Sequence, residues 1–325
     1  MAKRFSLRDN LNPEIAEFLE SVGKVQAKPP VRAFLVGGLV RDVLLGVESP
    51  DIDLLIEGDG VAFAKKLKER WTEFFPELPE PVRCISFKRY RTAKLLFDRE
   101  VLPGVSELDF ASTRGERYPT PGAAPEVWPA GLEEDLRRRD FSINAIGVGL
   151  SQGELGQVFD LFNGFEHLQS KQLVVLHDNS FVDDPVRVLR GARFIARFGF
   201  SFDSKTQLLA NDALGRDLLS TVPKRRLFDE LRKALSDEPV DVVVFKLNEL
   251  GLFKYLLPEG AAGSDALKQF NELMPKQPWQ NYLAYLCCEL PAHELIDWLN
   301  EVQAGAEDSK AVVNAHKEFS ARERS

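Results

Sequence analysis

Cysteine, histidine and methionine are scarce in this chain of 325 residues, which contains three, four and two of them respectively. Two of the cysteines, Cys287 and Cys288, are neighbours that rarely bridge each other, and no spacing of cysteine and histidine is typical of a zinc site. The scarcity therefore argues against a zinc site and favours a reducing, cytoplasmic setting.

Long apolar runs and an excess of basic charge are also missing. No run approaches the roughly 18 residues of a membrane span, and residues 1–9 lack the apolar core of a signal peptide. The net charge of −8 argues against a protein that coats nucleic acid without specificity, so we expect neither a membrane nor DNA as a partner. A local basic groove is still compatible with this charge, because four arginines recur at helical spacing: Arg187, Arg190, Arg193 and Arg197. The alternative is that these arginines are solvated or paired with local acids.

Two aspartates, Asp51 and Asp53, are the most informative feature that is present. On a strand, side chains two residues apart point to the same face, so the two carboxylates would lie together. Such a pair suits Mg²⁺, which binds through one or two carboxylates plus substrate phosphates. The preceding Gly37-Gly38 turn offers a backbone that phosphates can approach. The combination predicts a nucleotide-using enzyme of the metal-assisted phosphoryl-transfer kind.

Hydrophobic periodicity predicts a mixed α/β N-terminal unit followed by a mostly helical one. Helices are expected at 11–24, 40–45, 61–70, 184–198, 203–213, 224–236, 240–250 and 281–303. Strands are expected at 33–36, through Asp51 and Asp53, in 82–97, and at 107–112, 143–150, 157–160 and 173–175. Residues 114–131 contain four prolines and three glycines, which predicts a loop, and its length favours a functional role.

Four segments in this order and spacing carry a family resemblance: 34–53, 133–145, 159–164 and 181–200. Together they resemble the class II tRNA nucleotidyltransferases, which include bacterial CCA-adding enzymes and poly(A) polymerases. The resemblance covers roughly residues 31–260. It implies an α/β nucleotidyltransferase head with a mixed, largely antiparallel sheet, followed by an all-helical C-terminal part. The implied organisation is an N-terminal helical extension (1–30), a catalytic head (31–165), a nucleotide-selecting neck (166–236) and a shorter than usual RNA-binding body (237–325).

The resemblance also assigns roles to the acidic residues. Asp51 and Asp53 would be catalytic and would hold two Mg²⁺ ions, the cofactor we expect, for phosphoryl transfer that releases pyrophosphate. A third carboxylate commonly completes such a site, and Asp109 is the candidate because it lies in a β run with apolar neighbours. A surface acid on a half-buried strand is the alternative reading of Asp109.

Further residues would bind the nucleotide. Gly37, Gly38 and Arg41 would approach its phosphates, whereas Arg137 is more simply a solvated charge. By resemblance, contacts with phosphate and ribose fall to Arg138, Arg139, Asp140 and Asn144, and Arg190 joins the nucleotide-binding set.

Asp184 and Arg187 would choose the base. Three residues apart on a predicted helix, they would share one face. A carboxylate accepts from an exocyclic amine and a guanidinium donates to a ring nitrogen or carbonyl, so the pair would admit CTP and ATP and reject UTP and GTP. An intrahelical ion pair is the alternative.

The resemblance implies addition of CCA, or part of it, from CTP and ATP to the 3′ end of tRNA without a template. Enzymes that add only CC or only A, poly(A) polymerases and non-catalytic RNA-binding relatives are the alternatives. The near full-length loop at 114–131 favours a chain able to use ATP. The family also has a hinge turn that corresponds here to Asp160 and Asn163-Gly164, where asparagine tolerates left-handed geometry.

Overall fold

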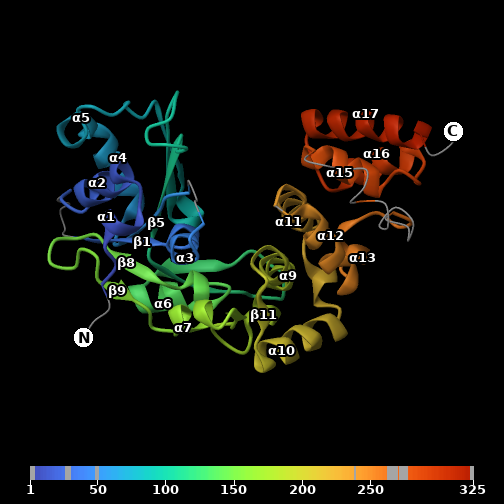
Figure 1. Cartoon of the computed structure of the whole chain (residues 1–325), viewed down its shortest axis with the longest axis horizontal. Helices are drawn as coiled ribbons and strands as arrows, with labels where there is room; N and C mark the ends of the chain where they lie inside the picture. The colour runs from blue at the N-terminus through green and yellow to red at the C-terminus, as the bar shows by residue number, and fades with distance from the viewer. Residues whose placement is uncertain are drawn as a thin grey trace. The chain divides into compact units, whose positions relative to one another are not determined.

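The structure, a computed structural model, describes residues 4–25, 31–47, 51–237, 239–261, 270 and 277–322. The chain divides into two compact units (Figure 1). The first comprises Met1–Arg117 and Pro125–His177, and the second comprises Tyr118–Ala124 and Asp178–Ser325. The predicted boundary at residue 30 lies outside the described residues, and the other predicted boundaries stay predictions.

A seven-stranded sheet forms the centre of the first unit, in the order β3-β4-β5-β2-β1-β8-β9. Its strands are β1 (Arg32–Val36), β2 (Asp53–Glu57), β3 (Arg83–Phe87), β4 (Thr92–Leu96), β5 (Glu107–Ser112), β8 (Gly147–Gly149) and β9 (Val158–Phe159). Only β2 and β5 pair in parallel, so the predicted mixed, largely antiparallel sheet is confirmed. Phe34 and Leu35 of β1 are both fully buried, which shows that this central strand is covered on both faces.

Helices pack around this sheet: α1 (Leu7–Asn10), α2 (Pro13–Val22), α3 (Gly38–Leu44), α4 (Gly60–Glu69), α5 (Trp71–Phe74), α6 (Leu132–Arg137) and α7 (Gly164–Gln169). The short elements η1 (Lys88–Tyr90), η2 (Ser142–Asn144) and β10 (Gln172–Leu173) complete the unit. Helix α2 begins where the Asn12 side chain accepts from the Glu14 amide, with proline at the first helical position. Its Phe18 ring lies 4.8 Å from the ring of Phe75, which caps the C-terminal end of α5, so this contact joins the two helices.

The region predicted as a single loop is partly a β-hairpin. Strands β6 (Arg114–Arg117) and β7 (Glu126–Pro129) pair antiparallel, so the loop prediction is wrong at both ends of 114–131. Proline is tolerated here because Pro129 ends the strand and its missing N–H removes little pairing. The tip, Tyr118–Ala124, belongs to the second unit.

The second unit is helical apart from the two-residue strand β11 (Ser201–Phe202) within its described part. Its helices are α8 (Ser180–Asp183), α9 (Val186–Phe198), α10 (Ser204–Gly215), η3 (Leu218–Thr221), α11 (Lys224–Ser236), α12 (Val240–Glu249), α13 (Phe253–Leu256), α15 (Trp279–Leu286), α16 (Ala292–Glu301) and α17 (Ala306–Arg322). The single helix expected at 281–303 is wrong. Helix α15 ends at Leu286, and α16 begins directly after its N-cap, Pro291. Proline lacks an N–H and disfavours helical geometry in the residue before it, so no continuous helix can pass through residues 290–291.

No helix in the described part is both long and apolar enough to span a membrane. Cys84, Cys287 and Cys288 are all free thiols.

The turn at residues 160–164 has the left-handed asparagine that the sequence predicted, and side-chain hydrogen bonds hold it. Asn163 has a left-handed φ of 57°, and the Asp160 carboxylate accepts from the backbone amides of Gly164 (2.6 Å) and Phe165 (3.0 Å). A Cβ added at Gly164 would lie 2.3 Å from the Ser142 carbonyl oxygen, which only a backbone shift could relieve.

We therefore expect Gly164→Ala to lower the free energy of unfolding by about 2 kcal/mol. Urea unfolding followed by circular dichroism measures the change. The matched control is Gly215→Ala, because a Cβ at Gly215 meets nothing within 4 Å, and this helical change should be neutral or stabilising. An equal loss in both variants would contradict the steric explanation.

Candidate active site

Adjacent strands bring two of the predicted catalytic carboxylates together. Asp53 and Asp109 are direct partners in the parallel β2–β5 register, and both line a cavity of about 310 Å³ in the first unit. Asp51 lies just before β2 rather than on it, and its side chain is exposed. The sequence therefore placed Asp51 wrongly on the strand, although its charge still acts on both Asp53 and Asp109.

The electrostatics of these carboxylates favour a bound cation. Burial raises the pKa of Asp53 to about 6, and the charges of Asp109 and Asp51 add to this rise against the opposing charge of Arg139. Burial likewise raises the pKa of Asp109, against the opposing charge of Lys94. Crowded, partly desolvated carboxylates are poor at holding their own charge and good at binding a compact cation.

Gly37 allows the chain to pass close to this pair. Its φ is 78°, and a Cβ there would lie 2.9 Å from Asp53 Oδ2. Glycine is therefore required both by the backbone conformation and by the approach to the carboxylate. Gly38 follows as the first residue of α3.

Arg138 and Arg139 line the same cavity from the end of α6. Both donate to the fully buried Asp135, at 2.7 Å and 3.0 Å respectively, and Arg138 also pairs with Glu116. Burial raises the pKa of Asp135, but Arg139 and Arg138 outweigh it and leave that pKa lowered. The Nε of Arg139 is buried and has no hydrogen-bond partner, so this guanidinium can still donate to an anion.

Three residues predicted to contact the nucleotide form a buried network instead of lining the cavity. Arg41 donates to Asp42 (2.8 Å) and Asn144 (2.7 Å), and the Asn144 amide donates to Asp140 (2.9 Å). All four side chains are buried. In this geometry they hold the Gly37-Gly38 turn, which begins α3, against η2.

Lys94 is a cation of the site that sequence reasoning missed. It lies on β4 directly opposite Asp109, and its Nζ lies 3.2 Å from Asp109 Oδ2 and 2.5 Å from Glu107 Oε1. The alternation of β4 was visible in the sequence, but the register that places Lys94 opposite Asp109 comes from the structure.

In the second unit, Asp184 is bound by an arginine from a distant helix. Arg226 Nη2 of α11 donates to both carboxylate oxygens of Asp184 at 3.0 Å, and its Nη1 donates to the carbonyl of Gly122 in the hairpin tip at 3.3 Å. Asp184 has extended backbone geometry and precedes α9, so the prediction that it shares a helix face with Arg187 is wrong. The cause is Pro185, which disfavours helical geometry in the residue before it. Arg187 is buried and donates to the Ser180 hydroxyl at 2.8 Å.

The arginine stripe of α9 faces acids of the same unit. Arg193 pairs with Glu230 and with Asp237, each at 2.8 Å. Arg190 lies 3.8 Å from Glu230, and Arg197 lies 3.9 Å from Asp237. These ion pairs join α9 to Glu230 of α11 and to Asp237, which follows α11. They agree with the alternative prediction, in which the arginines pair with local acids.

The cavity of the first unit suits Mg²⁺ in its donor chemistry. Among the described residues no three carboxylate, histidine or cysteine side chains converge on one point. Two carboxylate donors plus substrate phosphates are what Mg²⁺ prefers, and Asp53 and Asp109 supply the two. Asp53 and Asp109 would hold the ion, and Asp51 lies two residues before Asp53 in the chain.

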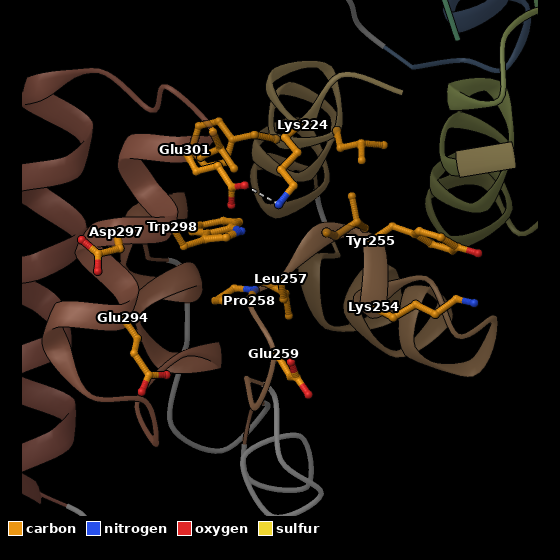
Figure 2. Close-up of a pocket in the computed structure, with 14 residues that line it drawn as sticks. Lys224, Lys254, Tyr255, Leu257, Pro258, Glu259, Glu294, Asp297, Trp298 and Glu301 are labelled. Carbon is orange, nitrogen blue, oxygen red and sulfur yellow. Dashed lines mark hydrogen bonds and ion pairs between the residues drawn. The ribbon is translucent and has the colours of Figure 1, made fainter. Parts of the chain in front are cut away.

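A second cavity, of about 550 Å³, lies within the second unit between α11, α13 and α16 (Figure 2). Its lining carries four carboxylates and two lysines: Lys224, Lys254, Glu259, Glu294, Asp297 and Glu301. Lys224 is already paired with Glu301 at 2.6 Å (Figure 2). The surplus of negative charge disfavours phosphates, so the cavity with Arg138 and Arg139 is the better nucleotide site.

Known proteins match both units. A family model described as "Poly A polymerase head domain" matches residues 33–174, and one described as "Probable RNA and SrmB-binding site of polymerase A" matches residues 199–263. The chain belongs to the poly(A) polymerase and tRNA nucleotidyltransferase family.

Two curated relatives and one solved structure illustrate the similarity. An A-adding tRNA nucleotidyltransferase of Geobacter sulfurreducens is 36% identical over 83% of this chain and 29% of its own length. The enzyme of the same name from Halalkalibacterium halodurans is 36% identical over 77% of this chain and 56% of its own. A tRNA nucleotidyltransferase complexed with a primer tRNA and an incoming ATP analogue is similar with a TM-score of 0.70 and 28% identity, over 90% of this chain and 82% of that one. The chain thus spans about a third to just over half of these curated relatives.

Proposed function

We propose that this protein adds nucleotides to the 3′ end of tRNA without a template, using ATP or CTP or both, by metal-dependent nucleotidyl transfer in which the 3′ hydroxyl attacks the α-phosphate and pyrophosphate leaves. The observation that carries the proposal is the register of Asp53 with Asp109 beside a cavity that also exposes Arg138 and Arg139. Two cation-binding carboxylates next to two phosphate-binding guanidinium groups are the parts that phosphoryl transfer requires. The names of both curated relatives favour ATP as a substrate.

The residues that line the cavity of the first unit would bind the metal ion and the triphosphate. Asp53 and Asp109 would hold Mg²⁺, which when bound neutralises phosphate charge and lowers the pKa of a coordinated hydroxyl. Arg139, whose Nε has no partner, would donate to the triphosphate, and Arg138 would add positive charge beside it. The glycine at position 37 leaves room for the phosphates next to Asp53.

Asp184 would read the base. A carboxylate has about four acceptor sites, and Arg226 Nη2 uses one on each oxygen, so acceptor capacity is left for an exocyclic amine. Cytosine carries such an amine at C4 and adenine at C6, whereas uracil and guanine present at the corresponding position a carbonyl that would repel the carboxylate. Arg187 would assist as a donor.

One assay tests the activity and its product. The purified chain with Mg²⁺ is given tRNA that ends before, within or after CC, and ATP and CTP are offered singly and together. We expect incorporation that depends on Mg²⁺ and on the tRNA end, with ATP used on tRNA ending in CC. Long A tracts on generic RNA would instead indicate a poly(A) polymerase, and no incorporation under any condition would overturn the enzymatic proposal.

A further inference from the structure

The carboxylates of the candidate active site already have a cation beside them. Lys94 Nζ lies 3.2 Å from Asp109 Oδ2, and the lysine charge also acts on Asp53. The ammonium therefore occupies the neighbourhood in which a metal ion would be held.

A second acceptor for the lysine lies next to the first. Glu107 and Asp109 are two residues apart on β5 and so share a face of the sheet. Lys94 Nζ is closer to Glu107 Oε1, at 2.5 Å, than to Asp109. The Glu107 side chain is 49% exposed, so it can follow the lysine outward without losing a buried contact.

We infer that Lys94 is a displaceable counter-ion: it pairs with Asp109 while the site holds no metal, and it moves fully onto Glu107 when a divalent cation binds. The inference rests on the metal-dependent function proposed above and assigns positioning roles to Lys94 and Glu107, which the reaction scheme does not use. Lysine suits this part because its ammonium is a point charge on a flexible stem, whereas arginine is a planar fork.

The physical basis is competition between cations. An ammonium and a divalent ion that share one carboxylate repel each other strongly in a partly desolvated site. Metal binding must therefore separate Lys94 from Asp109. The interaction with Glu107 offsets part of that cost because the lysine keeps a carboxylate partner.

A plain cross-strand ion pair is the alternative. Lys94 and Asp109 are direct antiparallel partners, and such pairs stabilise a sheet by some tenths of a kcal/mol whatever the site does. That role would also weaken metal binding by simple repulsion, so the loss of Lys94 alone does not separate the two explanations. They differ in whether Glu107 acts through Lys94: displacement makes the effect of Glu107→Gln on metal affinity depend on Lys94, whereas a static pair leaves the two effects additive.

The experiment measures binding of Mn²⁺ alone to the full chain, by electron paramagnetic resonance of the free ion, without nucleotide or RNA. We expect Lys94→Met to tighten Mn²⁺ binding by about fivefold or more, and Lys94→Arg to stay closer to the wild type. We expect Glu107→Gln to weaken binding about threefold, because the displaced lysine then lacks an acceptor. In the Lys94→Met background the Glu107→Gln change should have no effect.

The outcomes discriminate sharply. Unchanged or weaker Mn²⁺ binding in a folded Lys94→Met variant overturns the inference, as does binding that persists in Asp53→Asn or is absent from every variant. If Glu107→Gln weakens binding equally in both backgrounds, Glu107 acts on the metal directly and not as an acceptor for the lysine, and the inference is overturned. Because the binding experiment contains no substrate, its result is independent of the tRNA assay. If nucleotide transfer fails but Lys94→Met still binds Mn²⁺ more tightly, the proposed function is wrong and the inference about Lys94 remains.

Discussion

Replacing Asp53 with asparagine is expected to abolish nucleotide transfer and, at the same time, to stabilise the metal-free protein. Asparagine keeps the shape but loses the negative charge that would hold Mg²⁺, so we expect the rate to fall by about a thousandfold or more. The stability gain follows from the crowding of the site. A pKa raised from 3.8 to about 6 corresponds to roughly 3 kcal/mol at neutral pH, and we expect about 1 to 3 kcal/mol of it to be recovered.

The sign of the effect fixes its pH dependence. The folded protein holds a proton at Asp53 more tightly than the unfolded chain does, so ionisation of Asp53 favours the unfolded state as the pH rises. The destabilisation is fully developed above about pH 6 and absent below about pH 4. The advantage of Asp53→Asn should therefore be seen at neutral pH and vanish in acid.

Urea unfolding in a chelator at several pH values measures this dependence, and single-turnover transfer measures the loss of activity. The exposed Asp98 is the matched control, and Asp98→Asn should change neither quantity. Retained transfer in Asp53→Asn would show that Asp53 does not hold the metal, and a stability gain independent of pH would refute the electrostatic explanation.

Removing Asp184 is expected to relax the choice of base. Without the carboxylate no group repels the carbonyl of uracil or guanine, so we expect discrimination against UTP and GTP to fall by about tenfold or more in Asp184→Ala. Arg226→Met should have a weaker effect of the same kind, because the carboxylate remains but loses the donor that orients it. The Arg226→Met substitution also removes the ion pair of Asp184, whose side chain is only 12% exposed, and so leaves a mostly buried carboxylate without that partner.

Single-turnover incorporation of each of the four nucleotides on tRNA ending in C or CC provides the measurement. The matched control is the neighbouring Arg225, which pairs with Asp229 on its own helix instead. Arg225→Met should preserve the order of nucleotide preference. Undiminished selectivity in Asp184→Ala would mean that other residues read the base.

The sequence was most informative where chemistry and periodicity agree within a short segment. Strand β5 was predicted at its observed bounds because its side chains alternate. The glycine turn that precedes an acidic segment likewise predicted that Asp53 lies on the following strand, where it is the first residue of β2. Patterns of this kind are local, and they depend little on the rest of the fold.

Contacts between distant parts of the chain were beyond local patterns. Arg226 lies 42 residues from Asp184, so spacing alone favoured the nearer Arg187. The roles of Lys94 and of the β6–β7 hairpin likewise depend on strand register, which tertiary structure determines. The break before α16 was an oversight of a different kind, because Pro291 is visible in the sequence.

The β6–β7 hairpin limits how this protein can be divided or recombined. Its strands belong to one unit and its tip to the other, so the polypeptide passes between the units three times, near residues 117, 124 and 177. A fragment that stops at His177 would carry the tip without Arg226, and the complementary fragment would lack the Gly122 carbonyl to which Arg226 donates. Exchanging the helical unit between relatives would therefore have to exchange the hairpin tip as well, and the two should evolve as one inherited block.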